Sequence, residues 1–334
     1  MASRFKGKKV FITGAEGFIG SHLVEALVRE GADLRAMVLY NSFNSWGNLE
    51  LLPADILKSI EIYSGDVRDP FSVEKGVAGC DYVFHLAALI AIPYSYQAPL
   101  SYVETNISGT LNVLEACRKH AVKRVIHTST SETYGTAIYT PIDEKHPLQG
   151  QSPYSASKIG ADKMAESYHL AFNLPVTTMR PFNTYGPRQS ARAVIPTIIS
   201  QALAGAHEVR LGSLTPVRDF TFVADTVEGF LSIALSDGAV GKTINFGYGE
   251  GITIGEIAGK IVDVLGLKGK VSVADDPQRH RPANSEVYKL ICNRDLAREV
   301  CHWEPRTTLT EGLGKTVEFI RSHPERFKSS IYNV

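Results

Sequence analysis

A tyrosine and a lysine four residues apart are the first residues in the sequence that could do chemistry. Tyr154 and Lys158 stand in the segment YSASK, and Ser152 and Pro153 before them are typical of a helix start. Side chains at positions i and i+4 share one face of a helix, so the ammonium would lie beside the phenol. A nearby cation lowers the pKa of a phenol, which could then take a proton from a substrate hydroxyl while hydride leaves the same carbon. Alone, this pattern usually marks a solvated helix face.

A carboxylate follows a predicted strand that ends at His127. The next residues, TSTSETYG, include Thr130 and Glu132. The carboxyl ends of parallel strands are where such folds place their chemistry, and a carboxylate beside hydroxyls suits acid–base work on carbon. The alternative is a hydrophilic loop with Glu132 in solvent. We interpret His127, with His85 and His169, as core or helix-face residues, and no Cys/His group has the spacing of a metal site.

A glycine-rich turn stands between the first predicted strand and the first predicted helix. Its sequence, GAEGFIG, spaces the glycines as G-x-x-G-x-x-G. Glycine permits a tight turn and a close backbone approach, and a helix start offers free N–H groups to a pyrophosphate. A turn from strand to helix needs glycine in any case, but this setting predicts dinucleotide binding. We expect the contacts to come from Gly14, Gly17, Phe18 and Ile19.

The end of the second predicted strand, VLYNS at residues 38–42, lacks the carboxylate that usually binds the adenosine ribose. It also lacks an arginine that could meet a 2′-phosphate, so the sequence favours NAD and leaves NADP open. We expect Asn41 and Ser42 to contact this end of the cofactor. Asp66 and Val67, after the third strand, are expected at the adenine edge, although Asp66 could equally be a turn residue.

Strands and helices alternate through the first half of the chain. Such alternation predicts an α/β fold with a doubly wound parallel sheet of the Rossmann type. Strands are predicted at residues 10–13, 34–39, 60–63, 82–85, 124–127 and 176–179, and helices at 18–30, 71–78, 100–119 and 154–172.

The pattern becomes mixed after residue 181. We expect a dinucleotide-binding domain over residues 1–181 and a smaller C-terminal α/β substrate lobe over 182–334, some of whose segments return to the first domain. The loop 40–53 is long and rich in Asn and Ser, which favours a functional or mobile segment. Further helices are predicted near 194–204, 224–236, 253–264 and 309–322, and strands at 208–211, 217–222, 243–246 and 271–273.

Composition limits the class of protein. The 334 residues include 35 Lys and Arg and 35 Asp and Glu, a neutral balance that gives no reason to expect nucleic acid or an anionic membrane as partner. Apolar residues make up 44%, which excludes disorder. The four cysteines form no C-x-x-C pair, and no run approaches the roughly 18 apolar residues of a membrane span. We expect a soluble, cytoplasmic protein with reduced thiols and no bound metal.

Five motifs in order resemble the extended short-chain dehydrogenase/reductase family over essentially the whole chain. Within it, the sequence Thr-Ser-Glu at 130–132 is similar to that of nucleotide-sugar 4,6-dehydratases, whereas 4-epimerases lack the glutamate because they never touch the C5 proton. The motifs are TGAEGFIG (13–20), HLAA (85–88), TNISGTLNVLEA (105–116), YSASK (154–158) and RPFNTYGPR (180–188).

A closer resemblance is to the nucleotide-activated N-acetylglucosamine 4,6-dehydratases of legionaminic acid biosynthesis. The shared words are VLYNSFNSWG (38–47), LIAIPYSY (89–96) and PRQSARAVIP (187–196). The resemblance implies that Tyr154 takes the 4-hydroxyl proton as C4 is oxidised, that Glu132 removes the C5 proton as water leaves C6, and that the recycled nicotinamide reduces C6. Thr130 would hydrogen-bond the C4 oxygen.

The resemblance also implies further contacts and a dimer. Asn106 matches the asparagine that supports the catalytic lysine through a water relay. The helices at 100–119 and 154–172 would form a four-helix bundle across the two-fold axis of a homodimer. Expected cofactor contacts add Leu86, Ala87, Ala88, Asn106, Tyr154, Lys158 and Pro181, and expected substrate contacts are Thr130, Asn183, Arg192, Val194, Arg218 and Arg281.

Two alternatives remain at this point. An NAD-dependent nucleotide-sugar 4-epimerase would share the fold and the cofactor, and would release a 4-hydroxyl product without loss of water. A non-catalytic dinucleotide sensor or scaffold is disfavoured, because it would have no chemical need for Tyr154, Lys158, Asn106 and Thr130 together. The nucleotide base (GDP, UDP or dTDP) and the hexose stay open.

Overall fold

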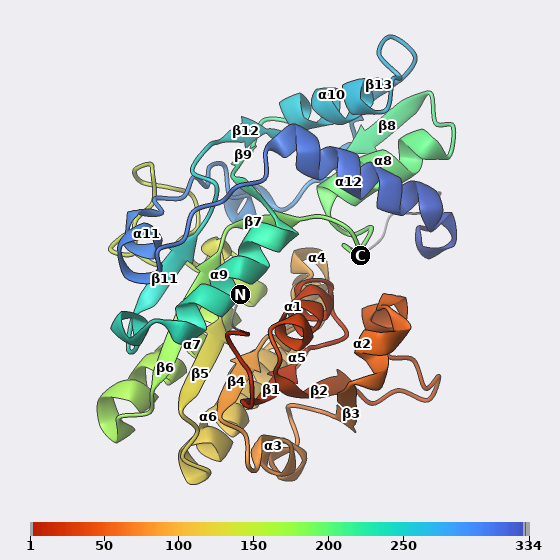
Figure 1. Cartoon of the computed structure of the whole chain (residues 1–334). Coiled ribbons are helices and arrows are strands. Elements are labelled where there is room, and N and C mark those ends of the chain that lie inside the picture. The colour runs from red at the N-terminus through yellow and green to blue at the C-terminus, as the bar shows by residue number, and fades with distance from the viewer. Residues whose placement is uncertain (1–2, 330, 332–334) are drawn as a thin grey trace.

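Parallel strands form the central sheet of the computed structural model, which describes residues 3–329 and 331 (Figure 1). The sheet has seven strands in the order β11-β6-β5-β4-β1-β2-β3, and every neighbouring pair in it is parallel. This is the predicted doubly wound sheet. Its strands are β1 (Lys9–Thr13), β2 (Asp33–Leu39), β3 (Ile60–Gly65), β4 (Tyr82–His85), β5 (Arg124–Thr128), β6 (Val176–Pro181) and β11 (Thr243–Phe246).

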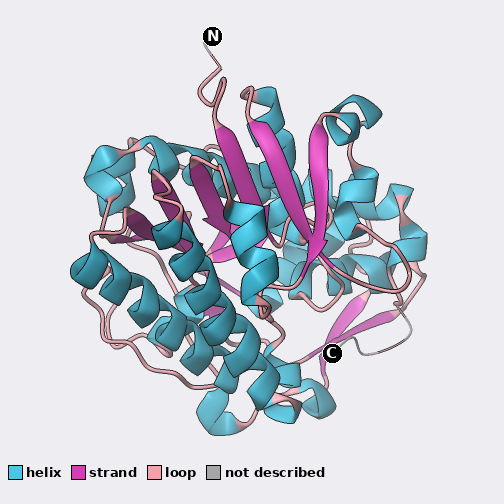
Figure 2. Cartoon of the chain, turned by 90° about the horizontal axis from the view of Figure 1, so that it is seen from below, coloured by secondary structure: helices cyan, strands magenta, loops and turns pink. Residues whose placement is uncertain are grey.

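Alternating side chains of these strands build two cores, one on each face of the sheet. In β1, Val10 and Ile12 join one core and Phe11 joins the other, as the two-residue period of a strand requires. Helices cover both faces (Figure 2). The first core takes in α1 (Phe18–Arg29) and α9 (Val223–Leu235), and the second α3 (Pro70–Val77), α6 (Gly109–Lys119) and α7 (Pro153–Phe172).

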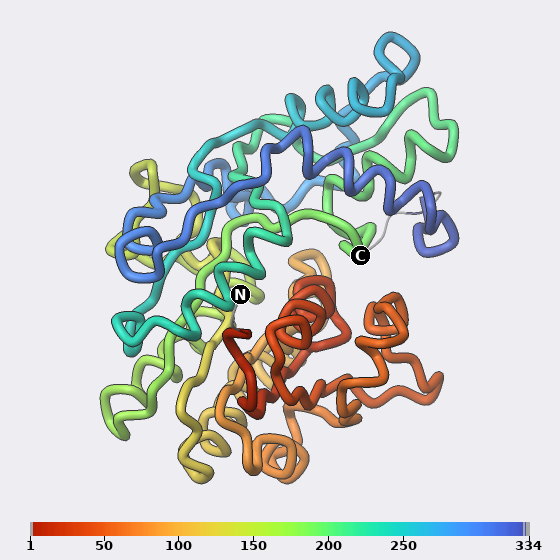
Figure 3. The backbone as a smooth tube through the Cα atoms, in the orientation of Figure 1, coloured from red at the N-terminus to blue at the C-terminus, as the bar shows by residue number. Residues whose placement is uncertain are grey.

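The C-terminal part of the chain lies across the top of the sheet in Figures 1 and 3. It contains three two-stranded sheets and three longer helices. The pairs are β7 (Asn183–Tyr185) with β10 (Phe220–Phe222), β9 (Val217–Arg218) with β12 (Ile252–Thr253), and β8 (Glu208–Leu211) with β13 (Ser272–Asp275), and the helices are α8 (Val194–Leu203), α10 (Ile254–Val264) and α12 (Leu309–Ser322).

Two later segments return to the first half of the chain. Helix α9 packs against α1, and β11 pairs with β6 at the edge of the central sheet. The C-terminal part is therefore not one continuous lobe.

Several local differences from the predicted elements have physical causes. The expected strand 217–222 is interrupted at Asp219, whose buried carboxylate accepts the backbone N–H groups of Tyr248, Gly249 and Cys292 at 2.8, 2.8 and 3.0 Å. The expected helix 100–119 is α5 (Pro99–Tyr102), a π-helical turn (Val103–Ser108) and α6. Short helices that lack a long apolar period were missed, namely α2 (Ala54–Lys58), α4 (Ile92–Gln97) and α11 (Asp295–Cys301).

The loop 40–53 contains a 3₁₀ turn (Gly47–Leu51), and five further 3₁₀ turns connect elements elsewhere in residues 3–329. Within the described part of the chain, no helix combines the length and the apolar character needed to cross a bilayer. The same residues contain no cluster of three or more His, Cys, Asp or Glu side chains able to hold a metal ion. These five 3₁₀ turns are Ser131–Tyr134, Asp237–Ala239, Pro277–Arg279, Ala283–Ser285 and Pro324–Arg326.

Candidate active site

The glycine loop lies at the carboxyl edge of the sheet, between β1 and α1. Gly14 has φ +69°, and a Cβ on it would lie 2.7 Å from the backbone nitrogen of Ala87. A Cβ on Gly20 would lie 2.1 Å from the carbonyl oxygen of Gly14. Glycine is therefore required for the loop to pack against the end of β4 and against its own helix. No side chain caps the N-terminus of α1 at Gly17, so its first N–H groups suit a pyrophosphate.

The segment after β4 is fixed to β1. The N–H of Leu86 donates to the carbonyl of Thr13 at 3.1 Å, and the N–H of Ala87 donates to the Thr13 hydroxyl at 3.1 Å. Leu86 and Ala87, two of the predicted cofactor contacts, therefore lie beside the glycine loop, and Ala88 is the next residue. Pro181 is the last residue of β6 at the same edge.

The residues expected at the adenosine end are less open. Asn41 donates to the carbonyls of Leu39 and Ser45 and accepts the N–H of Ser45, so its amide shapes the loop. Ser42 is exposed and Val67 is buried. Asp66 forms an ion pair with Arg68 at 2.6 Å, which lowers the pKa of Asp66.

A carboxylate that sequence reasoning missed reaches this end of β2. The strand itself ends without an acid, as noted from the sequence, but Glu16 of the glycine loop accepts the N–H of Leu39 at 3.0 Å. The sequence signal was an acidic residue inside the glycine-rich turn, and only the folded loop shows where its side chain goes.

Tyr154 and Lys158 lie on the buried face of α7, near its start. Ser152 and Ser155 form a capping box there, and Pro153 occupies the first turn, which explains why the helix begins at this point. The ammonium of Lys158 donates to the carbonyl of Thr128 at 2.6 Å. Burial lowers the pKa of Lys158 to about 8, against the opposing effect of Asp162.

The expectation that Lys158 lowers the pKa of Tyr154 is wrong for the chain alone. Burial raises the pKa of Tyr154, and the negative charge of Glu132 adds to this, while the Thr130 side chain acts in the opposite direction. The physical reason is that the phenol is buried while the Lys158 ammonium is engaged with the end of β5. Activation of the phenol therefore needs more than the neighbouring lysine.

Asn106 holds the turn of α7 that lies between Tyr154 and Lys158. It lies in the π-helical turn, and its amide nitrogen donates to the hydroxyl of Ser157 at 2.9 Å and to the carbonyl of Leu89 at 3.0 Å. Its amide oxygen accepts the N–H of Leu89 at 2.9 Å. Because Ser157 lies between Tyr154 and Lys158, Asn106 ties their helix to the segment after β4.

A buried ionic cluster centred on Asp162 lies next to Lys158 on α7 and at the end of β5. The carboxylate of Asp162 accepts from the Ser129 hydroxyl at 2.6 Å, from Arg180 at 2.7 Å and from the ring of His127 at 3.0 Å. Burial alone would raise the pKa of Asp162, but Arg180 and then His127 outweigh it, so this pKa lies well below its ordinary value. Asp162 shares the helix face of Lys158 and fixes the end of β5, from which the segment to Glu132 continues. His85 and His127 are core residues, as predicted.

Replacing Asp162 with Asn is expected to destabilise the fold by about 3 kcal/mol or more, because it leaves the Arg180 charge buried without a partner. Since the folded-state pKa of Asp162 lies below its unfolded value near 3.8, its contribution is complete above that pH and lost as pH falls further. Urea unfolding at pH 7 and pH 3 measures both effects. Asp263→Asn, which removes an exposed ion pair to Lys268, is the control and should change stability little. An Asp162→Asn loss no larger than the control would contradict this account.

Thr130 and Glu132 stand where β5 runs into a 3₁₀ turn. The Thr130 hydroxyl accepts the N–H of Glu132 at 3.2 Å and caps the turn Ser131–Tyr134. The Glu132 side chain is 12% exposed, and one carboxylate oxygen lies 3.8 Å from a guanidinium nitrogen of Arg281. Glu132 thus points inward and not into bulk solvent, which removes the alternative of a solvated loop.

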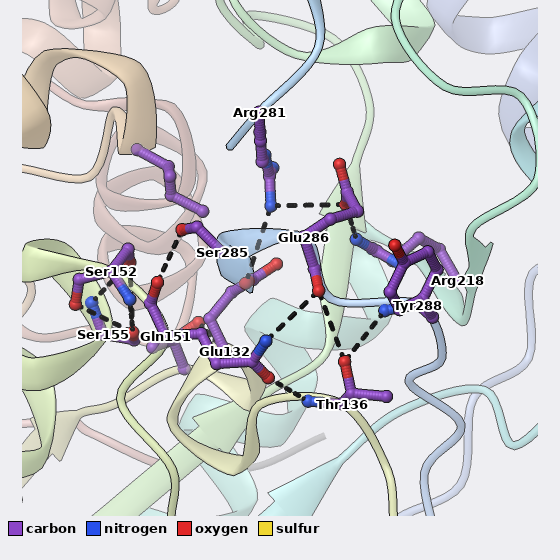
Figure 4. Close-up of polar contacts among 12 residues, drawn as sticks. Glu132, Thr136, Gln151, Ser152, Ser155, Arg218, Arg281, Ser285, Glu286 and Tyr288 are labelled. Atoms are coloured by element: carbon purple, nitrogen blue, oxygen red, sulfur yellow. Dashed lines mark hydrogen bonds and ion pairs between the residues drawn. The ribbon is translucent and has the colours of Figure 1, made fainter. Parts of the chain in front are cut away.

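Two arginines and two carboxylates form an alternating row at the site (Figure 4). The guanidinium of Arg281 points between Glu132 and Glu286, 3.9 Å from the latter, and Arg218 lies 3.4 Å from the same Glu286 oxygen. The Nη1 of Arg281 is buried and has no hydrogen-bond partner among the described residues. Both predicted arginines, Arg218 and Arg281, lie in this row. The row also contains Glu286, which the sequence analysis missed because nothing in its spacing distinguished it.

The segment that carries Arg281 and Glu286 is fastened to the rest of the site. The Ser285 hydroxyl donates to the Gln151 carbonyl at 2.5 Å, and the Gln151 amide donates to the Glu286 carbonyl at 3.2 Å. The Thr136 hydroxyl donates to the same carbonyl at 3.3 Å. These bonds hold the C-terminal segment against the turn that contains Glu132.

The remaining predicted substrate contacts are placed differently. Asn183 begins β7, and its amide oxygen is buried without a partner among the described residues. Val194 is the half-buried first residue of α8. Arg192 is exposed, and its side chain donates to the Ser190 hydroxyl at 3.3 Å.

Comparisons with known proteins find similar sequences and similar folds. The family model described as GDP-mannose 4,6 dehydratase matches residues 11–316. A dTDP-glucose 4,6-dehydratase of Streptomyces antibioticus is 31% identical, over 94% of this chain and 92% of its own. A solved dTDP-glucose 4,6-dehydratase of Streptomyces venezuelae with NAD bound has 28% identity and a TM-score of 0.85, over 96% and 99%. A solved UDP-N-acetylglucosamine 4-epimerase of Methanobrevibacter ruminantium has 31% identity and a TM-score of 0.85, over 96% and 100%.

Proposed function

The chain belongs to the GDP-mannose 4,6-dehydratase-type family of extended short-chain dehydrogenases/reductases, which contains nucleotide-sugar dehydratases and epimerases, and from this premise we propose that it is a nucleotide-sugar 4,6-dehydratase. Its substrate would be GDP- or UDP-N-acetylglucosamine, and its product the 4-keto-6-deoxy sugar nucleotide. The words shared with the legionaminic acid enzymes favour that route.

The inward carboxylate of Glu132 carries this proposal. Only a dehydratase needs a base for the C5 proton, and Glu132 is a half-buried carboxylate on the same turn as Thr130. The dehydratase and epimerase relatives share the fold, so the fold does not decide between the two reactions. The decision rests on Glu132.

The residues would act in sequence on one hexose. Tyr154 takes the proton of the 4-hydroxyl, with Thr130 hydrogen-bonded to the C4 oxygen. The resulting ketone acidifies the C5–H bond, so Glu132 removes that proton and delivers a proton to the C6 oxygen, which leaves as water. When hydride is added at C6, C5 takes up a proton from solvent through Glu132. NAD, when bound, supplies the hydride acceptor at C4 and the hydride donor at C6, and its positive ring adds a charge that favours the phenolate.

The glycine cradle fits NAD, because only glycine leaves room between the loop and Ala87, and because the start of α1 is uncapped. Gly14, Gly17, Phe18 and Ile19 would hold its pyrophosphate. Arg218 and Arg281 would bind the diphosphate of the sugar nucleotide, since a guanidinium matches phosphate oxygens in a bidentate manner. The Arg281 nitrogen and the Asn183 amide oxygen, which are buried without a hydrogen-bond partner among the described residues, support this assignment.

The test is incubation with GDP-, UDP- and dTDP-linked glucose, mannose and N-acetylglucosamine. Mass spectrometry should show the loss of one water from one substrate class. An epimerase would change the retention time of the sugar nucleotide without a change in mass, and that result would replace the proposal by the alternative.

We also propose a homodimer built on α5, the π-helical turn, α6 and α7. Helices α6 and α7 pack together, and apolar side chains on this assembly stay exposed, among them Leu100 at 66% and Leu170 at 74%. Sedimentation velocity at micromolar concentration should give twice the chain mass of 36.5 kDa. Leu100→Glu should reduce it to the monomer because a carboxylate would have to be buried. A monomeric parent protein would contradict the proposal.

A further inference from the structure

Glu16 stands out among the polar side chains near the cofactor edge, because one of its carboxylate oxygens is buried and unpartnered among the described residues. We propose that Glu16 is the carboxylate that binds the adenosine ribose and that it selects NAD against NADP. This inference rests on the proposed function only in requiring that the glycine loop binds a dinucleotide.

The position of the carboxylate is the first step. In dinucleotide-binding folds, an acid at the end of the second strand binds the ribose 2′-hydroxyl. Here β2 ends at Leu39 and continues into Tyr40 and Asn41, none of which is an acid. The Oε1 of Glu16 accepts the N–H of Leu39 at 3.0 Å, so an acid from the glycine loop occupies this strand end.

The second step is that one oxygen of the carboxylate accepts no hydrogen bond. Oε1 is engaged by Leu39, whereas Oε2 is buried and lacks a partner among residues 3–329 and 331. Burial raises the pKa of Glu16, against the backbone N–H groups that lower it, and no cationic side chain contributes. A buried acceptor without a donor is costly, and a ribose hydroxyl would provide that donor. The 2′-phosphate of NADP would instead place roughly two negative charges next to the Glu16 carboxylate.

The surroundings hold Glu16 in this place. The N–H of Asn48 donates to the Glu16 carbonyl at 3.0 Å. A Cβ on Gly47, which has φ +57°, would lie 3.2 Å from the Glu16 Cβ, so the loop after β2 packs closely on the Glu16 stem.

Two arginines that contact the loop after β2 have side-chain partners other than Glu16, although Nη1 of Arg188 is buried without a hydrogen-bond partner among the described residues. Arg188 pairs with Glu25 at 2.9 Å, and Arg326 donates to the Asn48 side chain at 2.9 Å. Neither makes a hydrogen bond or ion pair to Glu16. The charged side chain that hydrogen-bonds to the end of β2 is therefore Glu16.

The experiment measures which dinucleotide the protein holds. Parent protein and Glu16→Gln are dialysed against an equimolar mixture of NAD and NADP, and the bound cofactors are released by denaturation and quantified by mass spectrometry. Glutamine keeps an acceptor for the Leu39 N–H and removes the charge. The parent should hold NAD in large excess, and Glu16→Gln should lower the bound NAD:NADP ratio at least about tenfold, since juxtaposed like charges are what discriminate.

The matched control is Glu61→Gln. It removes an exposed acid of β3 that pairs with Arg35 of β2, and it should leave the bound NAD:NADP ratio unchanged. Thermal melts verify that the variants are folded, and Glu16→Ser provides a second variant without the charge. An unchanged ratio in both Glu16 variants, or a parent that prefers NADP, would overturn the role of Glu16 while the dehydratase proposal stands. A parent that retains neither dinucleotide would overturn the proposed function as well.

Discussion

Glu132→Gln is expected to slow formation of the 4-keto-6-deoxy product by about a thousandfold, in the range of a lost general acid–base group. The amide has nearly the shape of the carboxylate but cannot take the C5 proton. The substitution leaves Arg218 and Arg281 in place, so the variant should still bind the nucleoside diphosphate, and loss of the competing Glu132 charge should not weaken it. Mass spectrometry of the product and calorimetric titration with the free nucleoside diphosphate measure the two properties separately.

A deuterium experiment locates the lost step. In deuterated water the parent should place deuterium at C5, because the proton removed there exchanges with solvent, whereas Glu132→Gln should not. Glu166→Gln, an exposed acid on α7 that pairs with Lys163, is the matched control and should behave as the parent. Ketosugar production by Glu132→Gln at the parent rate would remove the dehydratase assignment.

Local sequence patterns were sufficient to predict the strands of the sheet, the position of the glycine loop and the shared helix face of Tyr154 and Lys158. Each depends on short-range physics: strand and helix periodicity, the conformational freedom of glycine, and the i and i+4 geometry of α7. Gly14 illustrates this, because its positive φ and its contact with Ala87 follow from a tight turn between β1 and α1. The order of the elements then determines which strand ends meet at one edge.

Long-range contacts could not be predicted in the same way. Glu286 lies 154 residues after Glu132 and is brought near it only by the bonds of Ser285 to Gln151 and of Gln151 to Glu286. Glu16 stands in a recognised motif, but its contact with Leu39 depends on how the loop after β2 packs over it. The pKa of Tyr154 was misjudged for a related reason, since a pattern along one helix shows a neighbouring cation but not the depth of burial.

Tyr154→Phe is expected to reduce the turnover rate by about a thousandfold or more, because it removes the phenolic oxygen that takes the 4-hydroxyl proton. The ring should keep its place, since it packs edge-on to Tyr102 with centroids 6.3 Å apart. With C4 never oxidised, C5 is never acidified, so Tyr154→Phe should lose both the ketosugar and the deuterium uptake at C5. In this it differs from Glu132→Gln, which should still oxidise C4 and show the absorbance of reduced nicotinamide when substrate is added.

The pH dependence adds a second readout for the same residue. Burial raises the pKa of Tyr154, so the parent rate should rise with pH as the phenol ionises. The rise should end near pH 8, because the pKa of Lys158, lowered by burial to about 8, marks where the supporting cation loses its charge. Tyr168→Phe, further along the same helix and hydrogen-bonded to Glu115, is the control and should keep the parent rate and profile. A Tyr154→Phe protein with the parent rate would assign the first proton transfer to another group, with Thr130 as the nearest hydroxyl on the turn that carries Glu132.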